Sequence, residues 1–347
     1  MNTGALSDSA DPIVIVGAGL AGWTVAREIR NRDASRAVTL VCADRGDFYS
    51  KPMLSNALAQ GKSADQLIQI SAAAQAQKLG VTVQAQVQVH SIDVERQVLI
   101  TSAGETRFGE LVLALGADPV RLPIEGAEHM LSVNDWQDYA IFRERLDSIG
   151  SARVAIVGGG LIGSEFANDL AASGHPVMVV DPGHWPVSQL IDAEIGKGLA
   201  NALLELGVQF YWGDVVASIR HTDSGASYFL ELRSGQTIEA DVVLSAVGLR
   251  PRTALAEAAG LRVQRGIVVN ANGQASHPHI WALGDCAAYE SVVAADGSPR
   301  TLPFVLPIMA ASKAIADGLT GTPTPIRFGP MKVRVKTPAF PVSVDAT

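Results

Sequence analysis

Cysteine is scarce in this chain of 347 residues, where only Cys42 and Cys286 occur. They lie far apart in the sequence, and neither belongs to a C-x-x-C or C-x4-C pair. A redox-active dithiol or a thiolate metal site needs such closely spaced cysteines. We therefore expect no metal site and no dithiol chemistry, and we interpret both cysteines as small buried residues.

Basic residues are also in deficit, because 27 Lys and Arg stand against 35 Asp and Glu and leave a net charge of -8. Non-specific binding of nucleic acids draws most of its affinity from basic side chains, so this balance argues against a nucleic-acid partner. No run reaches the ~18 apolar residues of a membrane helix. Residues 1–10 lack the basic and apolar regions of a signal peptide. We expect a cytoplasmic protein without membrane insertion.

Glycine, by contrast, is abundant, with 33 residues, and it organises the stretch 11–30, DPIVIVGAGLAGWTVAREIR. Ile13–Val16 has the β-branched, apolar character of a buried parallel strand, and Trp23–Arg30 has helix-forming residues. Between them lies a G-x-G-x-x-G at residues 17–22. Its first glycine permits a tight turn, its second lets the backbone approach a pyrophosphate, and its third lets helix and strand pack closely. The phosphates would rest on the helix N-terminus.

A second strand, Val38–Cys42, supports this interpretation, because Asp44 follows it 22 residues past Gly22. An acid roughly 20 residues past the last glycine is placed to hold ribose hydroxyls. A plain α/β turn with a solvent-facing Asp44 is the alternative.

The same pattern occurs again at Ser151–Val157, where an apolar strand runs into Gly158, Gly159, Gly160 and Gly163 and then into a helix through Ser173. A second strand follows, and Asp181 ends it 18 residues past the last glycine. Two such fingerprints predict two dinucleotide sites. A carboxylate accepts the 2'-hydroxyl of NADH but repels the 2'-phosphate of NADPH, and no Arg occurs in residues 182–187, so we expect NADH at the second site.

Other segments complete the two α/β units. We expect a helix at Gln66–Leu79, strands at Val81–Val89 and Leu111–Leu115, and a late helix within Leu302–Leu319. The segment IWALGDC, residues 280–286, places Asp285 at the end of a strand, where ligands of parallel sheets bind. A local turn role for this aspartate is the alternative.

Short motifs beyond the glycine loops carry a family resemblance: YSKPMLS, LALGADPVRLP, GLIGSEFANDL, SAVGLRPR, IWALGDC, VLPIMAA and VKTPAFP. Over residues 11–347 the chain resembles the pyridine-nucleotide flavoprotein reductases with two dinucleotide-binding domains, and most of all the rubredoxin reductases. The resemblance implies an α/β fold of two Rossmann-like domains. Residues 11–117 and 249–324 would form a discontinuous FAD-binding domain, 118–248 an NADH-binding domain, and 325–347 the start of a C-terminal interface domain. Family members usually continue further, so we expect this last domain to be short.

The resemblance also implies which residues bind the cofactors FAD and NADH. Asp44 would bind the adenosine ribose of FAD, Val89 its adenine, Asp285 its ribityl chain and Val305 the flavin. The full set of expected cofactor-binding residues is Gly17, Ala18, Gly19, Leu20, Ala21, Gly22, Ala43, Asp44, Lys51, Pro52, Val89, Gly116, Gly158, Gly160, Gly163, Glu165, Asp181, Gly248, Asp285, Val305 and Lys336.

Lys51 and Glu165 are the expected catalytic pair, because the resemblance suggests that they meet near flavin N5. Such a pair would offset the desolvation of each charge and fix where the nicotinamide stacks. Two separately solvated side chains are the alternative. No side chain need act as a nucleophile, since the chemistry belongs to the cofactor: NADH would give a hydride to flavin N5, and reduced FAD would release single electrons to a carrier.

The expected partner is a small electron-carrier protein. The absence of a cysteine pair, and of a Cys in YSKPMLS, argues against the disulfide and peroxide reductases of this superfamily. Ser-Lys-Pro, where ferredoxin reductases usually have Arg-Pro-Pro, favours rubredoxin over ferredoxin. A ferredoxin reductase of an oxygenase system and a non-catalytic FAD-binding protein stay as alternatives. Basic side chains in 326–347 suggest either a docking patch for an acidic carrier or a strand edge protected by charge: Arg327, Lys332, Arg334 and Lys336.

Overall fold

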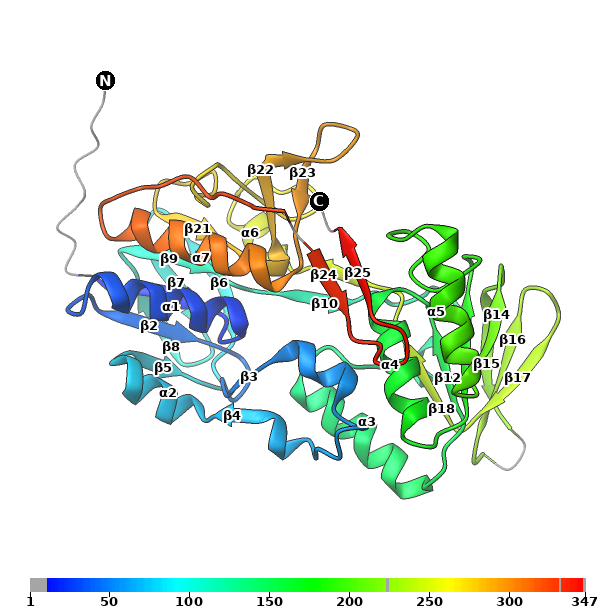
Figure 1. Ribbon diagram of the computed structural model, residues 1–347. Coiled ribbons are helices and arrows are strands. Elements are labelled where there is room, and N and C mark those ends of the chain that lie inside the picture. The colour runs from blue at the N-terminus through cyan, green and yellow to red at the C-terminus, as the bar shows by residue number, and fades with distance from the viewer. Residues whose placement is uncertain (1–10, 223–224, 331, 346–347) are drawn as a thin grey trace. The chain divides into compact units, whose positions relative to one another are not determined.

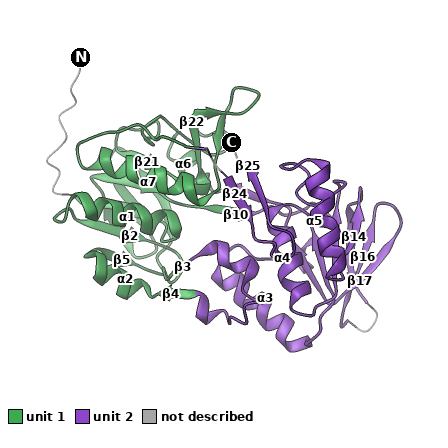
Figure 2. Cartoon of the chain, viewed as in Figure 1, with its two compact units in different colours: residues 1–49, 68–118, 251–329 green, residues 50–67, 119–250, 330–347 purple. Residues whose placement is uncertain are grey.

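The computed structural model describes residues 11–222, 225–330 and 332–345 and divides the chain into two compact units (Figure 2). Unit 1 combines residues up to 49 with 68–118 and 251–329, and unit 2 combines 50–67, 119–250 and 330 onward. Each unit is built on a parallel five-stranded sheet. The expected α/β fold is therefore confirmed.

The sheet of unit 1 has the parallel order β21(Ile280–Ala282), β9(Glu110–Leu113), β1(Ile13–Val16), β2(Val38–Val41) and β5(Thr82–Gln84). β1 lies at its centre, and all four of its residues are buried, as the apolar run without polar alternation predicts. Its carboxyl end leads into the first glycine loop.

Two helices cover one face of this sheet, α1(Leu20–Arg32) and α7(Val305–Leu319), which lie side by side (Figure 1). The register Ile15↔Val112↔Trp281 places these three side chains on a common face. A methyl group on Gly22 of α1 would lie 3.5 Å from Ile15 Cγ2, and one on Gly318 of α7 would lie 2.6 Å from Trp281 Cη2. Small residues therefore bring both helices close to the sheet.

The other elements of unit 1 surround this core. An antiparallel sheet of β6, β7 and β8 is inserted between β5 and β9 in the sequence. These elements are β3(Phe48–Tyr49), β4(Ile68–Ile70), α2(Ala72–Leu79), β6(Val89–Asp93), β7(Val98–Thr101), β8(Gly104–Arg107), α6(Ala254–Ala258), β20(Ile267–Val269), the 3-10 turn η4(Gly284–Cys286), β22(Ala287–Val293) and β23(Pro299–Thr301). β10(Ala117–Pro119) and β19(Leu249–Pro251) contain the points where the chain passes between the units.

Unit 2 repeats the same plan. Its parallel sheet has the order β11(Leu131–Ser132), β18(Val242–Ser245), β12(Val154–Val157), β13(Val177–Asp181) and β14(Gln209–Trp212). An antiparallel sheet again interrupts the parallel strands in the sequence, here between β14 and β18. The remaining elements are η1(Lys51–Asn56), η2(Asp65–Leu67), η3(Ala127–His129), α3(Trp136–Ile149), α4(Leu161–Ala172), α5(Ala193–Glu205), β15(Val216–His221), β16(Tyr228–Leu232), β17(Thr237–Ala240), β24(Lys332–Val335) and β25(Val342–Asp345).

Two expected elements of unit 1 are wrong in part. The helix expected at Gln66–Leu79 begins only at Ala72, where Ser71 caps it by accepting the Ala74 N–H at 3.3 Å; the preceding Ile-Gln-Ile alternates and pairs with β3 instead. The strand expected at Val81–Val89 is broken, because Gln86 has a left-handed φ of 58°. The Gln86 N–H bonds to the Asp44 carbonyl at 2.8 Å, which turns the chain toward the end of β2.

The chain crosses between units after residues 118 and 250, close to the boundaries expected from the sequence, but residues 50–67 and 330 onward group with unit 2. Hydrogen bonds from unit 2 account for the placement of 50–67. Asp169 accepts the N–H groups of Leu58 and Ala59 at 3.0 and 2.9 Å. Trp136 Nε1 and Arg143 Nη1 donate to the carbonyls of Ala64 and Lys62 at 2.7 and 3.1 Å.

No helix within the described residues is long and apolar enough to cross a membrane.

Gly22 and Gly19 give a matched test of the loop geometry. Gly22→Ala would drive a methyl group into the Gly17 carbonyl oxygen, whereas the space around a methyl group on Gly19 is open. We expect Gly22→Ala to lower the free energy of unfolding of the FAD-free protein by about 1–3 kcal/mol, and Gly19→Ala to lower it by less than about 1 kcal/mol. Urea unfolding followed by circular dichroism measures both. Equal losses would show that close packing at Gly22 is unimportant.

Candidate functional site

The first glycine loop leaves room for a phosphate at the start of α1. Gly17 has a φ of 110°, which few other residues adopt, and a methyl group there would overlap the Ala114 carbonyl oxygen. A methyl group on Gly19 would meet no atom within 4 Å. Gly19 is also the N-cap of α1, and no side chain caps the helix. Backbone N–H donors therefore border an open space, which fits a pyrophosphate.

The carboxyl ends of the strands in unit 1 bring further expected residues to the same edge of the sheet. Ala43 and Asp44 follow β2 and are exposed, and Asp44 Oδ1 accepts the Gly46 N–H at 2.9 Å. This is the local turn bond of the alternative interpretation, and it leaves the second oxygen available for a ribose hydroxyl. Gly116 follows β9 with a φ of 73°. All three residues therefore lie at the edge where ligands of parallel sheets bind.

Asp285 lies in η4, directly after β21. A methyl group on the adjacent Gly284 would lie 3.1 Å from the Cβ of Ala21 in the glycine loop and 3.9 Å from Ile308 of α7. The structure therefore places the turn that carries Asp285 beside the first loop, although 260 residues and more separate them in the sequence.

Val89 and Val305 lie on different elements of unit 1. Val89 begins β6, two residues after the Val87 N–H bonds to the Cys42 carbonyl at 2.9 Å, so it follows the segment that joins the end of β2. Val305 opens α7, whose N-cap Phe304 makes no side-chain cap. Val305 and Leu306 are 40% and 58% exposed. An uncapped helix start with exposed apolar side chains fits a flat, partly polar ring system.

The second glycine loop has the geometry of the first. Gly158 has a φ of 104°, and a methyl group there would lie 2.6 Å from the Ala246 carbonyl oxygen. One on Gly163 would overlap the Gly158 carbonyl oxygen, whereas one on Gly160 would meet no atom within 4 Å. Gly160 is the N-cap of α4 and again makes no side-chain cap. This geometry fits an anion at a second helix start, as the sequence repeat predicts.

Asp181 ends β13 beside this loop. Its Oδ2 accepts the Gly159 N–H at 2.6 Å, and its Oδ1 accepts the Gly183 N–H at 2.7 Å. These two bonds fix the orientation of the carboxylate, and each oxygen keeps a further lone pair for a ribose hydroxyl. Gly248, another expected cofactor-binding residue, follows β18 with a φ of 104°.

Glu165 lies in the second turn of α4 and is 3% exposed. Its Oε1 accepts the Lys336 N–H at 2.9 Å, and its Oε2 is hydrogen-bonded to Lys336 Nζ and, at 2.5 Å, to Ser55 Oγ. Lys51 opens η1 next to Pro52, and its Nζ donates to Asn134 Oδ1 at 2.7 Å. The structure therefore pairs Glu165 with the ammonium group of Lys336. A role for Lys51 and Glu165 near flavin N5 stays a prediction.

Two further polar residues of α4 hold the same segments, and the sequence analysis missed them. Asn168 Oδ1 accepts the Ala339 N–H at 3.1 Å. Asp169 accepts two N–H groups of 50–67, and burial raises the pKa of its carboxyl group. Glu165, Asn168 and Asp169 have the spacing i, i+3, i+4, which places them on one face of α4. Polar side chains along one face of an otherwise apolar helix are the sequence signal that could have identified them.

Both cysteines are buried, which confirms their expected character. Burial raises the pKa of Cys42 to about 12 and that of Cys286 to about 11. Both therefore remain protonated thiols at neutral pH and are poor nucleophiles. Within the parts of the chain that the structure describes, no three His, Cys, Asp or Glu side chains are grouped to hold a metal ion.

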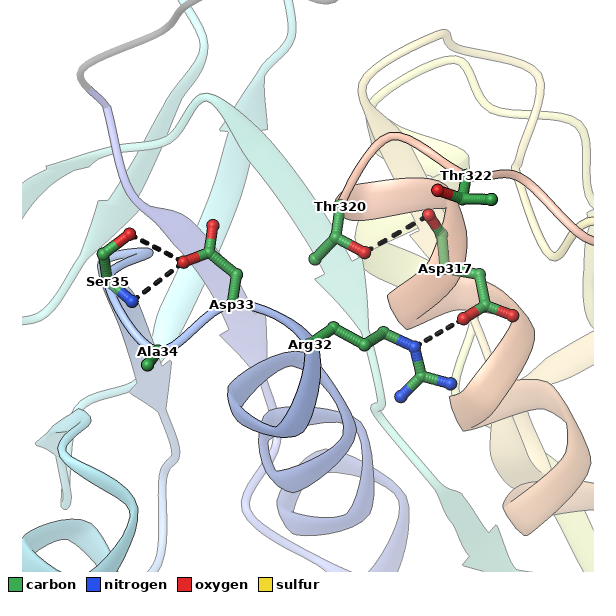
Figure 3. Close-up of a pocket in the computed structure, with 7 residues that line it drawn as sticks. All are labelled: Arg32, Asp33, Ala34, Ser35, Asp317, Thr320 and Thr322. Atoms are coloured by element: carbon green, nitrogen blue, oxygen red, sulfur yellow. Dashed lines mark hydrogen bonds and ion pairs between the residues drawn. The ribbon is translucent and has the colours of Figure 1, made fainter.

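A surface depression of about 620 Å³ lies at the C-terminal ends of α1 and α7 (Figure 3). Arg32 Nε contacts Asp317 Oδ1 at 2.5 Å there, and Asp33 Oδ1 accepts the Ser35 N–H at 2.8 Å. Because the glycine loop is at the opposite end of α1, this depression is separate from the dinucleotide site. It is lined by Arg32, Asp33, Ala34, Ser35, Asp317, Thr320 and Thr322.

A double-mutant cycle tests the ion pair between Glu165 and Lys336. Lys336→Met leaves a buried carboxylate without its cation, so we expect it to lower the free energy of unfolding by about 3 kcal/mol. Glu165→Gln in the Lys336→Met background should restore part of that loss, because the amide carries no charge. Chemical unfolding of the four proteins gives the coupling energy, and strictly additive losses would contradict the pairing.

Comparison with known proteins agrees with this geometry. The family model of pyridine nucleotide-disulphide oxidoreductases matches residues 11–317. The chain is 42% identical over 335 residues to a rubredoxin-NAD(+) reductase of Alcanivorax borkumensis, covering 96% of this chain and 85% of that protein. It is 37% identical to a nitric oxide reductase FlRd-NAD(+) reductase of Aeromonas hydrophila subsp. hydrophila, covering 99% of this chain and 86% of that protein.

The putidaredoxin reductase chain in the crystal structure of the covalent putidaredoxin reductase-putidaredoxin complex is similar with a TM-score of 0.85 and 27% identity, covering 95% of this chain and 80% of that one. These findings confirm the resemblance, the two Rossmann-like folds, and FAD and NAD(H) as the cofactors. The chain belongs to the pyridine nucleotide-disulphide oxidoreductase family.

Proposed function

We propose that this protein is an NADH-dependent FAD reductase that passes electrons to a small one-electron carrier, with rubredoxin as the first candidate. The observation that carries the proposal is the pair of glycine loops, each of which opens on an uncapped helix N-terminus. They occur in a chain that is 42% identical to a rubredoxin-NAD(+) reductase. A chain with two dinucleotide sites and no reactive thiolate is suited to moving electrons between cofactors.

In this proposal unit 1 binds FAD and unit 2 binds NADH. The position of Asp285 beside the first loop, together with the exposed apolar start of α7, supports FAD in unit 1. The fixed carboxylate of Asp181 supports NADH in unit 2, because a 2'-phosphate would meet a negative charge that two backbone N–H groups hold in place. Bound FAD supplies the conversion of a hydride from NADH into single electrons.

Residues of unit 2 hold the side chains that we assign to the flavin environment. Asp169 and Arg143 bind the backbone of 50–67, so Lys51 and Pro52 belong to a segment with a defined conformation. Lys336 neutralises the buried Glu165. We propose that Lys51 and Glu165 orient the nicotinamide, while Lys336 acts through Glu165 as a positioning residue.

The choice of rubredoxin as the first candidate carrier rests on the sequence identities to related reductases. The higher identity belongs to the rubredoxin-NAD(+) reductase, at 42%, compared with 27% for putidaredoxin reductase, so a ferredoxin-type carrier is the second candidate. The basic C-terminal segment gives less support than its sequence suggests. Lys336 contacts Glu165, and Lys332 lies opposite Asp345 in the β24–β25 pair. A cytoplasmic location is also part of the proposal, and cell fractionation would test it.

Reduction of purified carriers tests the function directly. With NADH as the electron donor, we expect the FAD-loaded protein to show a higher kcat/KM for the reduction of rubredoxin than for the reduction of a [2Fe-2S] ferredoxin. The reason is that the chain is more similar to a rubredoxin-NAD(+) reductase than to putidaredoxin reductase. Ferricyanide serves as the control, because a small acceptor needs no docking surface. Reduction of ferricyanide but of neither protein would refute the proposed partners, and no reduction of any acceptor would refute the enzyme itself.

The role of Lys51 is tested by the rate of flavin reduction. We expect Lys51→Ala to slow the reduction of FAD by NADH roughly 10- to 100-fold, because misplacement of the reacting groups carries a cost of this order. Stopped-flow absorbance of the flavin measures the rate. Lys62→Ala, in the same segment, is the matched control and should leave the rate unchanged. An unchanged rate in Lys51→Ala would remove Lys51 from the site.

A further inference from the structure

We propose that Trp212 forms a wall of the second dinucleotide site and packs against the adenosine of the bound nucleotide. This inference rests on the proposed binding of NADH to unit 2 and names a residue that the glycine fingerprint does not contain. It follows from the position of Trp212 beside the glycine loop, from the support of its ring by Phe210, and from a comparison with unit 1.

Trp212 and Asp181 end neighbouring strands. They are direct partners in the parallel register of β13 and β14, so both stand at the carboxyl edge of the sheet. A methyl group on Gly159 would lie 3.1 Å from Trp212 Cζ3 and 3.3 Å from Asp181 Cβ. The indole ring, the carboxylate and the middle of the glycine loop therefore border one point of unit 2.

The direction of the side chain is set by the strand. Tyr211 packs against the apolar cluster between the parallel sheet and the antiparallel sheet of unit 2, so Trp212 points to the opposite face. Phe210 stacks on its ring, with the ring centres 4.5 Å apart and the planes 15° apart. The Gly213 N–H also bonds to the Gly183 carbonyl at 2.9 Å and joins the loops that follow β13 and β14. Trp212 is half-buried, and these contacts pack its ring beside the glycine loop.

The site defines where the adenosine must lie. If the pyrophosphate rests on Gly160 and the ribose hydroxyls bind Asp181, the nucleotide runs from β12 toward β13, and the base continues toward β14. Trp212 presents an aromatic ring at that end, beside the glycine loop. Adenine has a flat π face, and stacking on an aromatic ring is favourable for any base.

Unit 1 provides an internal comparison. The first loop has Ala18 where the second has Gly159. Because Gln84 pairs with Val41 and Tyr211 with Val180, the counterpart of Trp212 after the third strand is Ala85. The second copy has thus exchanged two alanines for a glycine and a tryptophan on the same framework. Gly159 has no side chain and so leaves space for the indole ring. Because unit 1 has Ala85 at the matching position, the ring serves the ligand of unit 2 alone.

Calorimetric titration with ADP-ribose tests the inference on the FAD-loaded protein. This probe carries the adenosine but no nicotinamide, so it leaves the flavin oxidised and needs no turnover. We expect Trp212→Leu to raise the Kd for ADP-ribose roughly 5- to 100-fold, and Trp212→Phe to retain most of the affinity. Trp185→Leu is the matched control in the same unit. Its Nε1 donates to the Ile191 carbonyl at 3.3 Å and its ring packs on Gly196 of α5, so the Kd should not change.

Each outcome decides one statement. An unchanged Kd in Trp212→Leu overturns the role of Trp212 but leaves NADH in unit 2. A wild-type protein that binds no ADP-ribose overturns the proposed site itself. If Trp212→Leu does not fold, fluorescence decides: ADP-ribose should quench the tryptophan emission of the wild type and not that of Trp212→Phe. Equal quenching in both would refute the inference.

Discussion

The structure depends on a close approach between two pieces of backbone, which occurs once in each unit. Gly22 and Gly163 come so near to the carbonyls of Gly17 and Gly158 that no side chain fits between helix and strand. This contact sets the start of each helix over the carboxyl end of its strand. The open space at the second glycine and the uncapped N–H groups fit a phosphate, and the acid after the next strand fits a ribose; that contact places all of them at one edge of the sheet.

The sequence predicts what depends on local residue patterns. The strand Ile13–Val16, both glycine loops and the aspartates Asp44 and Asp181 lie where the spacing places them. Contacts between residues far apart in the sequence could not be predicted from local patterns. The partner of Glu165 lies 171 residues away at Lys336, and the turn of Asp285 reaches the first loop only through the strand order. The helix expected from Gln66 failed because local alternation and the Ser71 cap outweighed the longer apolar pattern.

Helix α4 combines two tasks that the fingerprint alone does not require. Its first turn leaves backbone N–H donors uncapped, as the proposed dinucleotide site requires, while one of its faces binds the segments 50–67 and 330 onward through Glu165, Asn168 and Asp169. The buried charge of Glu165 is matched by Lys336 rather than left to solvent. Removal of one partner of a buried ion pair is strongly destabilising, so the helix that carries the second glycine loop also holds the two segments that pack on it.

The grouping of 50–67 with unit 2, between two pieces of unit 1, has a consequence for how the protein is encoded and assembled. The chain changes unit after residues 49, 67, 118, 250 and 329, so each unit is composed of three separate pieces. Neither unit can be copied into another gene as one uninterrupted stretch. Unit 1 also closes a long loop through residues 119–250 before its own sheet is complete, because β21 follows them in the chain, and such a loop costs entropy and slows folding. All five strands of the parallel sheet of unit 2, by contrast, lie within 119–250. The chain therefore supplies every strand of the second parallel sheet before it supplies the last strand of the first.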